Sequence, residues 1–202
     1  MKVRRFWSLY LAVPLVVVLL GSALFVTRTS AAGTKYRWDI ISIDFAAASI
    51  NAGGHASAIA NDSSSITLTG EGTFNAASAF GNLNVTGGGT WQTFDPSGNS
   101  TASGTYQVTS FVTFTVAPGT SRLPNDNIGN IKDQRGGLLF VTIQYSDGSP
   151  GVLTVSCDLL GTPDSVFEGI RVSKGFVDYW NGTAPVGGVN GNRTNFHILG
   201  DD

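Results

Sequence analysis

The chain has 202 residues, with 12 basic and 14 acidic side chains, two histidines and a single cysteine. Residues 1–32 hold four of the basic side chains and none of the acidic ones, so the rest carries eight against 14, a net charge of −6. An acidic domain without basic clusters excludes nucleic acid as a partner, because phosphates require Lys and Arg gathered on one face. A lone cysteine excludes an internal disulfide, so the fold must be held by its core, which about 170 residues can supply.

The N-terminal segment has the pattern of an export signal. MKVRR carries three positive charges, and no charged residue follows between Phe6 and Val26. A cationic flank before an apolar run directs export with the positive end kept in the cytoplasm. Small residues at 30–32 suit cleavage before Gly33, yet the run also reaches the ~20 residues that span a bilayer. Residues 1–32 are therefore predicted to be either a signal peptide or an N-terminal transmembrane anchor, with residues 33–202 a single exported domain, secreted or membrane-anchored.

Period-2 alternation of apolar and polar residues predicts strands along the exported domain. In SITLTGEGTF, Ile66, Leu68 and Phe74 share one face, and in NVTGGGTWQTF Val85 and Trp91 do. In TYQVTSFVTFTV the apolar face is predicted to hold Tyr106, Val108, Val112, Phe114 and Val116. Such one-sided strands are typical of antiparallel sheets. Four further strands are predicted, at Tyr36–Phe45, Val166–Val172, Phe176–Trp180 and Phe196–Leu199.

The strongest local prediction is a β-hairpin in GLLFVTIQYSDGSPGVLTVSC. Two β-rich runs flank Asp147 and Gly148, and Gly tolerates the positive φ of a tight turn. Val141, Ile143 and Tyr145 share a face of the first strand, as do Leu153, Val155 and Cys157 on the second. Cys157 is accordingly interpreted as a small buried hydrophobe, because no nearby base that would activate a thiol is visible.

The fold class that follows is all-β. About eight strands at short spacing predict a single antiparallel β-barrel, with a two-sheet β-sandwich as the alternative. Glycine pairs and the run Gly87–Gly89 suit bends, bulges or close strand packing. Two stretches, Pro118–Gly137 and Asn181–Thr194, have the composition of long loops.

Motifs for common chemistries are missing from the sequence. It contains no phosphate-binding glycine loop, no G-x-S-x-G, no S-x-x-K and no H-E-x-x-H. Two histidines and one cysteine make a zinc site of the usual type improbable. We therefore predict neither a metal nor a cofactor. Five N-x-[ST] sequons, the first at Asn61, matter only in a host that glycosylates exported chains.

Three residues are candidates for acid–base chemistry. Glu168 shares strand parity with Val166 and Ile170, so a regular strand would bury its carboxylate and raise its pKa. Alternatively, a bulge at Gly169 would turn Glu168 outward, or Glu168 would form an ion pair with a nearby cation; in either case it would have a structural role and no catalytic one. Asp178 lies between aromatic residues, and His197 could act as a base beside a carboxylate.

Aromatic residues supply the candidates for ligand binding. In FVDYWN, Phe176, Asp178 and Trp180 share one face and Val177 and Tyr179 the other. Aromatic rings beside Asp and Asn are used in sugar-stacking sites and in polar-lined pockets, and also in ordinary barrel walls. Trp91, Tyr179 and Trp180 are the candidate ligand-binding residues.

The combination of VTGGGTW, YSDGSPGVLTVSC, GTPDSVFEGI and KGFVDYWN resembles uncharacterised exported bacterial β-rich proteins. That resemblance covers most of the chain after residue 35 and implies no activity, ligand or catalytic residue. The Gly-Thr-Phe and Gly-Gly-Thr strand ends are also similar in composition to small β-barrels of the dirigent and allene-oxide-cyclase type.

Three functions are compatible with the sequence. The first is a non-enzymatic exported domain that binds a small-molecule or surface ligand. The second is a metal-independent acid–base barrel enzyme, of the cyclase, isomerase or hydrolase type, which requires at least two of Glu168, Asp178 and His197 to converge in one pocket. The third is a structural or adhesive surface domain, whose partner is the membrane if the N-terminal segment stays uncleaved.

Overall fold

The computed structural model describes residues 33–77, 84–121, 123–183 and 191–200, so the predicted export segment lies outside the described residues. Within these ranges the chain is 64% strand and contains no α-helix. A single 3₁₀ turn, η1, spans Ile131–Asp133. The strands are β1 (Lys35–Asp44), β2 (Ser49–Ala52), β3 (Ala56–Ile59), β4 (Ser65–Leu68), β5 (Glu71–Asn75), β6 (Val85–Phe94), β7 (Ser100–Ala117), β8 (Asn125–Asp126), β9 (Gln134–Tyr145), β10 (Pro150–Cys157), β11 (Gly169–Lys174), β12 (Val177–Tyr179), β13 (Asn181–Thr183) and β14 (Arg193–Leu199).

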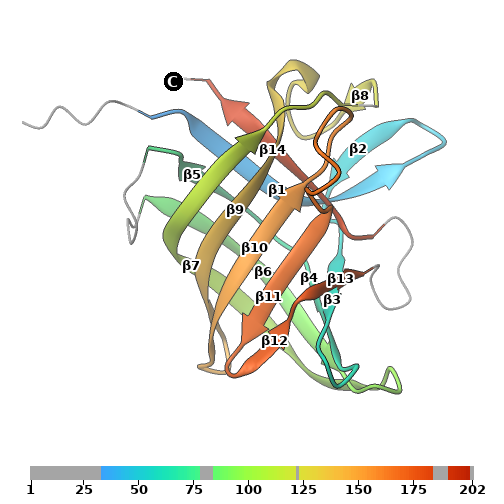
Figure 1. Ribbon diagram of the computed structural model, residues 1–202, viewed down its shortest axis with the longest axis vertical. Helices are drawn as coiled ribbons and strands as arrows, with labels where there is room; N and C mark the ends of the chain where they lie inside the picture. Colours follow the sequence, from blue (N-terminus) through green and yellow to red (C-terminus); the bar gives the residue numbers. More distant parts are fainter. Residues whose placement is uncertain (1–32, 78–83, 122, 184–190, 201–202) are drawn as a thin grey trace, which may run out of the picture. The chain divides into compact units, whose positions relative to one another are not determined.

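Six strands close into an antiparallel barrel in the order β1, β5, β6, β7, β9, β14 and back to β1 (Figure 1). Each neighbouring pair is joined by a ladder of antiparallel hydrogen bonds, so closure leaves the ring without a free edge. The predicted single antiparallel barrel is thus confirmed over the sandwich alternative.

Further strands extend the sheet beyond the ring. β10, β11 and β12 follow one another from β9, while β4, β3 and β13 follow from β6. The predicted hairpin is β9–β10, with Leu153 opposite Val141 and a turn at Gly148, whose φ is +86°. β2 pairs with the end of β1 and, in parallel, with the short β8.

The barrel interior is a packed aromatic core. Tyr36 stacks on Phe74 with a centroid distance of 5.4 Å, and Phe74 also contacts Phe111 and Phe196. Trp38 is fully buried, and its ring lies where a Cβ on Gly72 would meet Trp38 Nε1 at 2.6 Å. A Cβ on Gly87 of β6 would likewise meet Trp38 Cζ2 at 2.9 Å, so the run Gly87–Gly89 permits the close strand packing that was predicted for it.

The longest strand, β7, departs from the predicted alternation. Its register against β9 shifts between Val108 and Ser110 and again between Phe111 and Thr113. Two bulges invert and then restore the side-chain parity, which turns Phe111 into the core and leaves Val112 without a register partner. The predicted apolar face was wrong at Val112, because a uniform period of two does not allow for the extra residue of a bulge. Val116 lies on the same face as Phe114, near the end of the strand, and is 47% exposed.

Other boundaries also differ from the sequence predictions. The predicted SITLTGEGTF strand is interrupted at Thr69 and Gly70, so β4 and β5 pair with different halves of β6. β11 begins at Gly169 rather than at Val166. The predicted loop Pro118–Gly137 contains β8, η1 and the start of β9, and Asn181–Thr194 contains β13 and the start of β14.

Candidate functional site

A pocket forms where β14 leaves its partner β9. The two strands pair only at Phe196–Arg135 and His197–Gln134, and from Gly137 onward β9 pairs with β10 instead. The first half of β14 lies beside the end of β10, where the Thr194 hydroxyl donates to the Ser156 carbonyl at 2.5 Å. No ladder joins β10 and β14 among the described residues. The unfilled space at this junction is the pocket.

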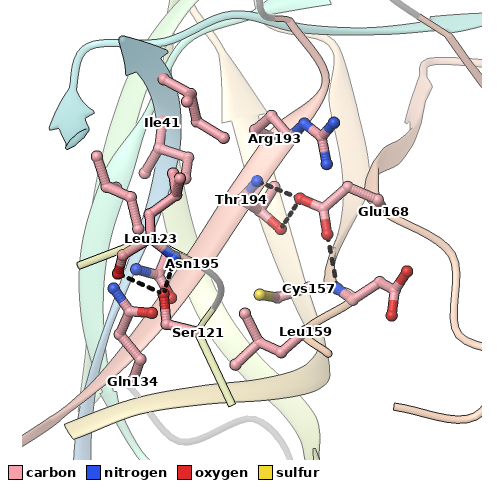
Figure 2. Close-up of a pocket in the computed structure, with 13 residues that line it drawn as sticks. Ile41, Ser121, Leu123, Gln134, Cys157, Leu159, Glu168, Arg193, Thr194 and Asn195 are labelled. Atoms are coloured by element: carbon pink, nitrogen blue, oxygen red, sulfur yellow. Dashed lines mark hydrogen bonds between the residues drawn. The ribbon is translucent and has the colours of Figure 1, made fainter. Parts of the chain in front are cut away.

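The pocket has a volume of about 110 Å³ and combines aliphatic with polar walls (Figure 2). For comparison, an engineered apolar cavity of about 150 Å³ holds benzene. The lining residues are Ile41, Ile43, Ile50, Ser121, Leu123, Gln134, Cys157, Asp158, Leu159, Glu168, Arg193, Thr194 and Asn195. Its size suits a molecule of a few heavy atoms.

Glu168 closes one side of the pocket by accepting two backbone hydrogen bonds. Asp158 N donates to its Oε2 and Thr194 N to its Oε1, both at 2.6 Å. These bonds satisfy the amide of Asp158, just past the end of β10, and the amide of Thr194 on β14, which has no ladder to β10 within the described ranges. Burial raises the pKa of Glu168 to about 7, although the two amide donors oppose the shift. Glu168 precedes the strand rather than lying within it, because Gly169 has φ +107°.

Cys157 lines the same pocket at the end of β10. Its side chain is buried within the main core cluster, as the sequence analysis predicted. Burial, together with the nearby Glu168 and Asp158 carboxylates, raises the pKa of the thiol well above its usual value. A thiol held protonated in this way is a poor nucleophile.

The opposite side of the pocket carries polar groups without partners. The side chain of Asn195 is 1% exposed, and neither its Oδ1 nor its Nδ2 has a hydrogen-bond partner among the described residues. Gln134, also buried, has an unpartnered Oε1. In Figure 2 both amides lie on the side of Ser121 and Leu123, away from Glu168. Buried polar atoms normally have hydrogen-bond partners. The side chains of Asn195 and Gln134 could therefore bind ordered water or a polar ligand at this side of the pocket.

A buried polar cluster continues from this corner along the outer face of β14. Asp126, on β8, accepts hydrogen bonds from His197 Nε2 at 2.6 Å and from Gln134 Nε2. Burial raises the pKa of Asp126, but these donors together with two backbone amides outweigh it, so the net shift is downward. Asp39 lies opposite Asn195 in the register of β1 and β14 and forms a salt bridge with Arg37. Burial raises the pKa of Asp39. The charge-assisted hydrogen bonds of Asp126 therefore join β8 to β9 and β14 of the barrel.

The three acid–base candidates do not share a pocket. Glu168 lines the pocket beside β10, while His197 is bonded to Asp126 and is not among the lining residues. Asp178 lies on β12 in a separate groove with Phe176 and Trp180. The convergence that the enzyme hypothesis requires is not found among the described residues.

The three aromatic candidates are equally dispersed. Trp91 is buried, donates its Nε1 hydrogen to Thr105 O at 3.1 Å, and lies beneath Lys174 Nζ at 4.4 Å from its ring. Tyr179 is buried in the core. Trp180 is half exposed and lines the groove with Asp178. Of these three candidates, only Trp180 presents an aromatic surface to solvent.

Sequence analysis missed Asn195 and Gln134. Their unmet hydrogen bonds arise from the branching of β9 between β10 and β14, which pairs residues far apart in the chain. An Asn next to the buried Phe196 was the only available signal, and it is indistinguishable from a solvent-facing strand residue.

Within the described ranges, no group of three or more His, Cys, Asp or Glu side chains could hold a metal ion. No helix in those ranges combines the length and apolarity needed to cross a membrane. No protein-family model, curated protein or solved structure matches the chain significantly.

Proposed function

We propose that this chain is an exported β-barrel binding protein that holds a small ligand in the pocket between β1, β10 and β14. The ligand has an apolar body and an end that both donates and accepts hydrogen bonds. The observation that carries this proposal is the buried carboxamide of Asn195, a residue that lines the pocket and whose two polar atoms have no hydrogen-bond partner among the described residues.

Energetics favours a polar guest at this corner. Each buried polar atom left unpaired costs about 1–3 kcal/mol, and Asn195 and Gln134 together present three such atoms. A carboxamide or a protonated carboxylic acid offers a donor and an acceptor side by side, which matches the paired groups of Asn195. Ile41, Ile43 and Leu123 would contact the apolar part of such a molecule.

Binding is better supported than catalysis. Both carboxylate oxygens of Glu168 already accept backbone hydrogen bonds, and the protonated Cys157 thiol lacks an activating base. Asp178 and His197 lie outside this pocket. The polar groups that line the pocket can therefore orient a ligand. Acid–base catalysis would need a second titratable group beside Glu168, and the pocket does not supply one of the predicted candidates.

Export is supported by the N-terminal pattern of cationic flank and apolar run. Either outcome for that segment, cleavage or anchoring, would place the barrel outside the cytoplasm. An exported barrel without disulfides fits a periplasmic or surface binding protein, whose membrane contact is the N-terminal segment when it is retained.

The test is ligand analysis on chain purified from the exported fraction. Native mass spectrometry would reveal a co-purifying molecule, and the intact mass would show whether residues 1–32 remain. Ligand-observed NMR with isobutyramide and isovaleric acid would probe the pocket directly. We expect Asn195→Leu to lose this binding and the exposed-amide control Gln107→Leu to retain it.

If no molecule co-purifies and neither probe binds, the proposal is overturned, and the polar groups of Asn195 and Gln134 would bind only water. Binding that survives Asn195→Leu would likewise place the ligand elsewhere on the barrel. A covalently altered probe recovered after incubation would instead favour the acid–base enzyme.

A further inference from the structure

The edge strand β12, with the residues that flank it on either side, presents an aromatic face to solvent. Phe176, Asp178 and Trp180 point outward in alternation, while Tyr179 points into the core. Phe176 is 101% exposed and Trp180 49% exposed. Large aromatic side chains left in water on one edge indicate a surface that has a partner.

A second chain segment turns this edge into a groove. The turn between β3 and β4 lies alongside β12, and Trp180 Nε1 donates to Asn61 Oδ1 at 2.9 Å. In the same turn, Asp62 Oδ1 accepts hydrogen bonds from Ser64 N at 2.9 Å and Ser64 Oγ at 2.6 Å, which fixes the turn. The indole is thus held in place by residues 119 positions away in sequence.

The groove has a volume of about 320 Å³ and is open to solvent. It is lined by Ala60, Asn61, Asp62, Phe176, Val177, Asp178 and Trp180, with no basic residue among them. Asp178 makes no side-chain hydrogen bond or ion pair within the part of the chain that the structure describes, so its carboxylate is free to accept. Rings and carboxylates therefore face the same space.

We propose that this groove binds a neutral carbohydrate chain. The C–H face of a pyranose ring would pack on Trp180 and Phe176, and its hydroxyl groups would donate to the carboxylates of Asp178 and Asp62. A rigid aromatic side chain provides this contact area at low entropic cost. The lack of basic side chains in the lining and the acidic surface of the domain disfavour an acidic polysaccharide.

A second copy of the chain is the poorer occupant. Self-association through this face would bring Asp62 and Asp178 of two copies together, and like charges at an interface are unfavourable. Two aromatic side chains flanking one short edge strand also provide much less area than the ~800 Å² per partner of a stable protein interface.

The groove is independent of the small-ligand pocket. Gly175, at the β11–β12 turn, donates to the Pro150 carbonyl at the start of β10, whereas the pocket lies at Cys157, where β10 ends. In Figure 1 the β11–β12 hairpin lies at the lower end of the barrel and β8 at the upper end. Failure of one proposal therefore leaves the other standing.

The test is native affinity electrophoresis of the chain, produced in a host that does not glycosylate Asn61, through gels containing laminarin, hydroxyethyl cellulose or mannan. We expect at least one polysaccharide to retard the wild type, with affinity reduced about tenfold or more by Trp180→Ala and by Phe176→Ala. Trp180→Phe keeps a stacking ring and should retain most of the binding. Asp178→Asn should weaken it, because an amide accepts less strongly than a carboxylate.

Two controls separate groove binding from other effects. Phe45→Ala removes an aromatic side chain that is 64% exposed but outside the groove, and Asn195→Leu alters only the other pocket, so both should bind like the wild type. Thermal unfolding of each variant would exclude misfolding. No retardation by any of the three polysaccharides, or retardation unchanged by Trp180→Ala, would overturn the proposal. So would a concentration-dependent dimer abolished by the same substitution, which would make the groove a self-association site.

Discussion

His197 Nε2 lies 2.6 Å from Asp126 Oδ2, which joins the last strand, β14, to the two-residue strand β8 across 71 positions of sequence. The side chains of both residues are buried, and the carboxylate also accepts from Gln134 Nε2 and from the backbone amides of Ile128 and Gly129. A buried carboxylate with several donors is strongly stabilised in its ionised form. This pair therefore holds the β8 segment, and with it the polar side of the pocket, against the barrel.

Asp126→Asn should lower the free energy of unfolding by about 2–4 kcal/mol at neutral pH, because an amide cannot satisfy the donors that converge on the carboxylate. The folded-state pKa of Asp126 is lowered, so its contribution is full above the unfolded pKa of about 3.9 and is lost as pH falls through the folded value. Urea unfolding at pH 7 and pH 3 would measure this. The difference between variant and wild type should shrink at low pH, and an equal difference at both values would contradict the assignment.

Glu168 should impose the opposite pH dependence. Its folded pKa of about 7 lies above its ordinary value of 4.5, so between these pH values the folded state keeps a proton that the unfolded state has released. Stability from this group should therefore fall as pH rises from about 4.5 to about 7. Glu168→Gln should be less stable throughout, since one backbone amide then faces an NH₂ group, and should lack this slope. Asp164→Asn, at an exposed loop position, serves as the control that should keep the slope.

Asn195→Leu should stabilise the ligand-free chain while abolishing binding. Replacing a buried carboxamide whose two atoms are unpaired by an apolar group of similar size removes a penalty of about 1–3 kcal/mol. Thermal unfolding of wild type and variant, both stripped of bound molecules, would measure it. Asn195→Asp, which buries a charge at the same place, should destabilise. A destabilised Leu variant would show that ordered water already satisfies the wild-type amide.

Gly169→Ala should cost about 3 kcal/mol or more. Gly169 has φ +107°, and a Cβ there would lie 2.1 Å from the side-chain oxygen of Asn192. The matched control is Gly98→Ala, with φ +84° but no atom within 4 Å of the added Cβ, which should cost only about 1 kcal/mol of backbone strain. Chemical denaturation would give the loss in free energy of unfolding for each variant. The Gly98→Ala loss measures backbone strain alone, and the additional loss in Gly169→Ala measures the steric overlap with Asn192. Equal losses would show that the Asn192 side chain moves aside freely.

Local patterns in the sequence were sufficient for much of the fold. Alternation in GLLFVTIQY and PGVLTVSC identified the β9–β10 hairpin with its buried faces, and Gly148 identified its turn. Burial of Cys157 and the close packing at the run Gly87–Gly89 were also predicted. These features depend on residues near each other in the chain, where a period of two and the steric freedom of glycine act directly.

Long-range features could not be predicted from the same patterns. The two bulges in β7 appear only when it is registered against β9, and they decide that Phe111, not Val112, faces the core. The sequence grouped Glu168, Asp178 and His197 by chemistry, and the structure places them at three separate sites.

The sequence by itself determined an all-β chain, its main strands and an N-terminal pattern typical of export. Only the tertiary structure decided that the ring closes through β1 and β14, that β9 divides its pairing between β10 and β14, and that Asn195 consequently faces an open pocket. The physical reason is that side-chain alternation is a property of each strand alone. The choice of neighbouring strand, and the space left where two neighbours diverge, depends on hydrogen bonds and packing between residues distant in sequence.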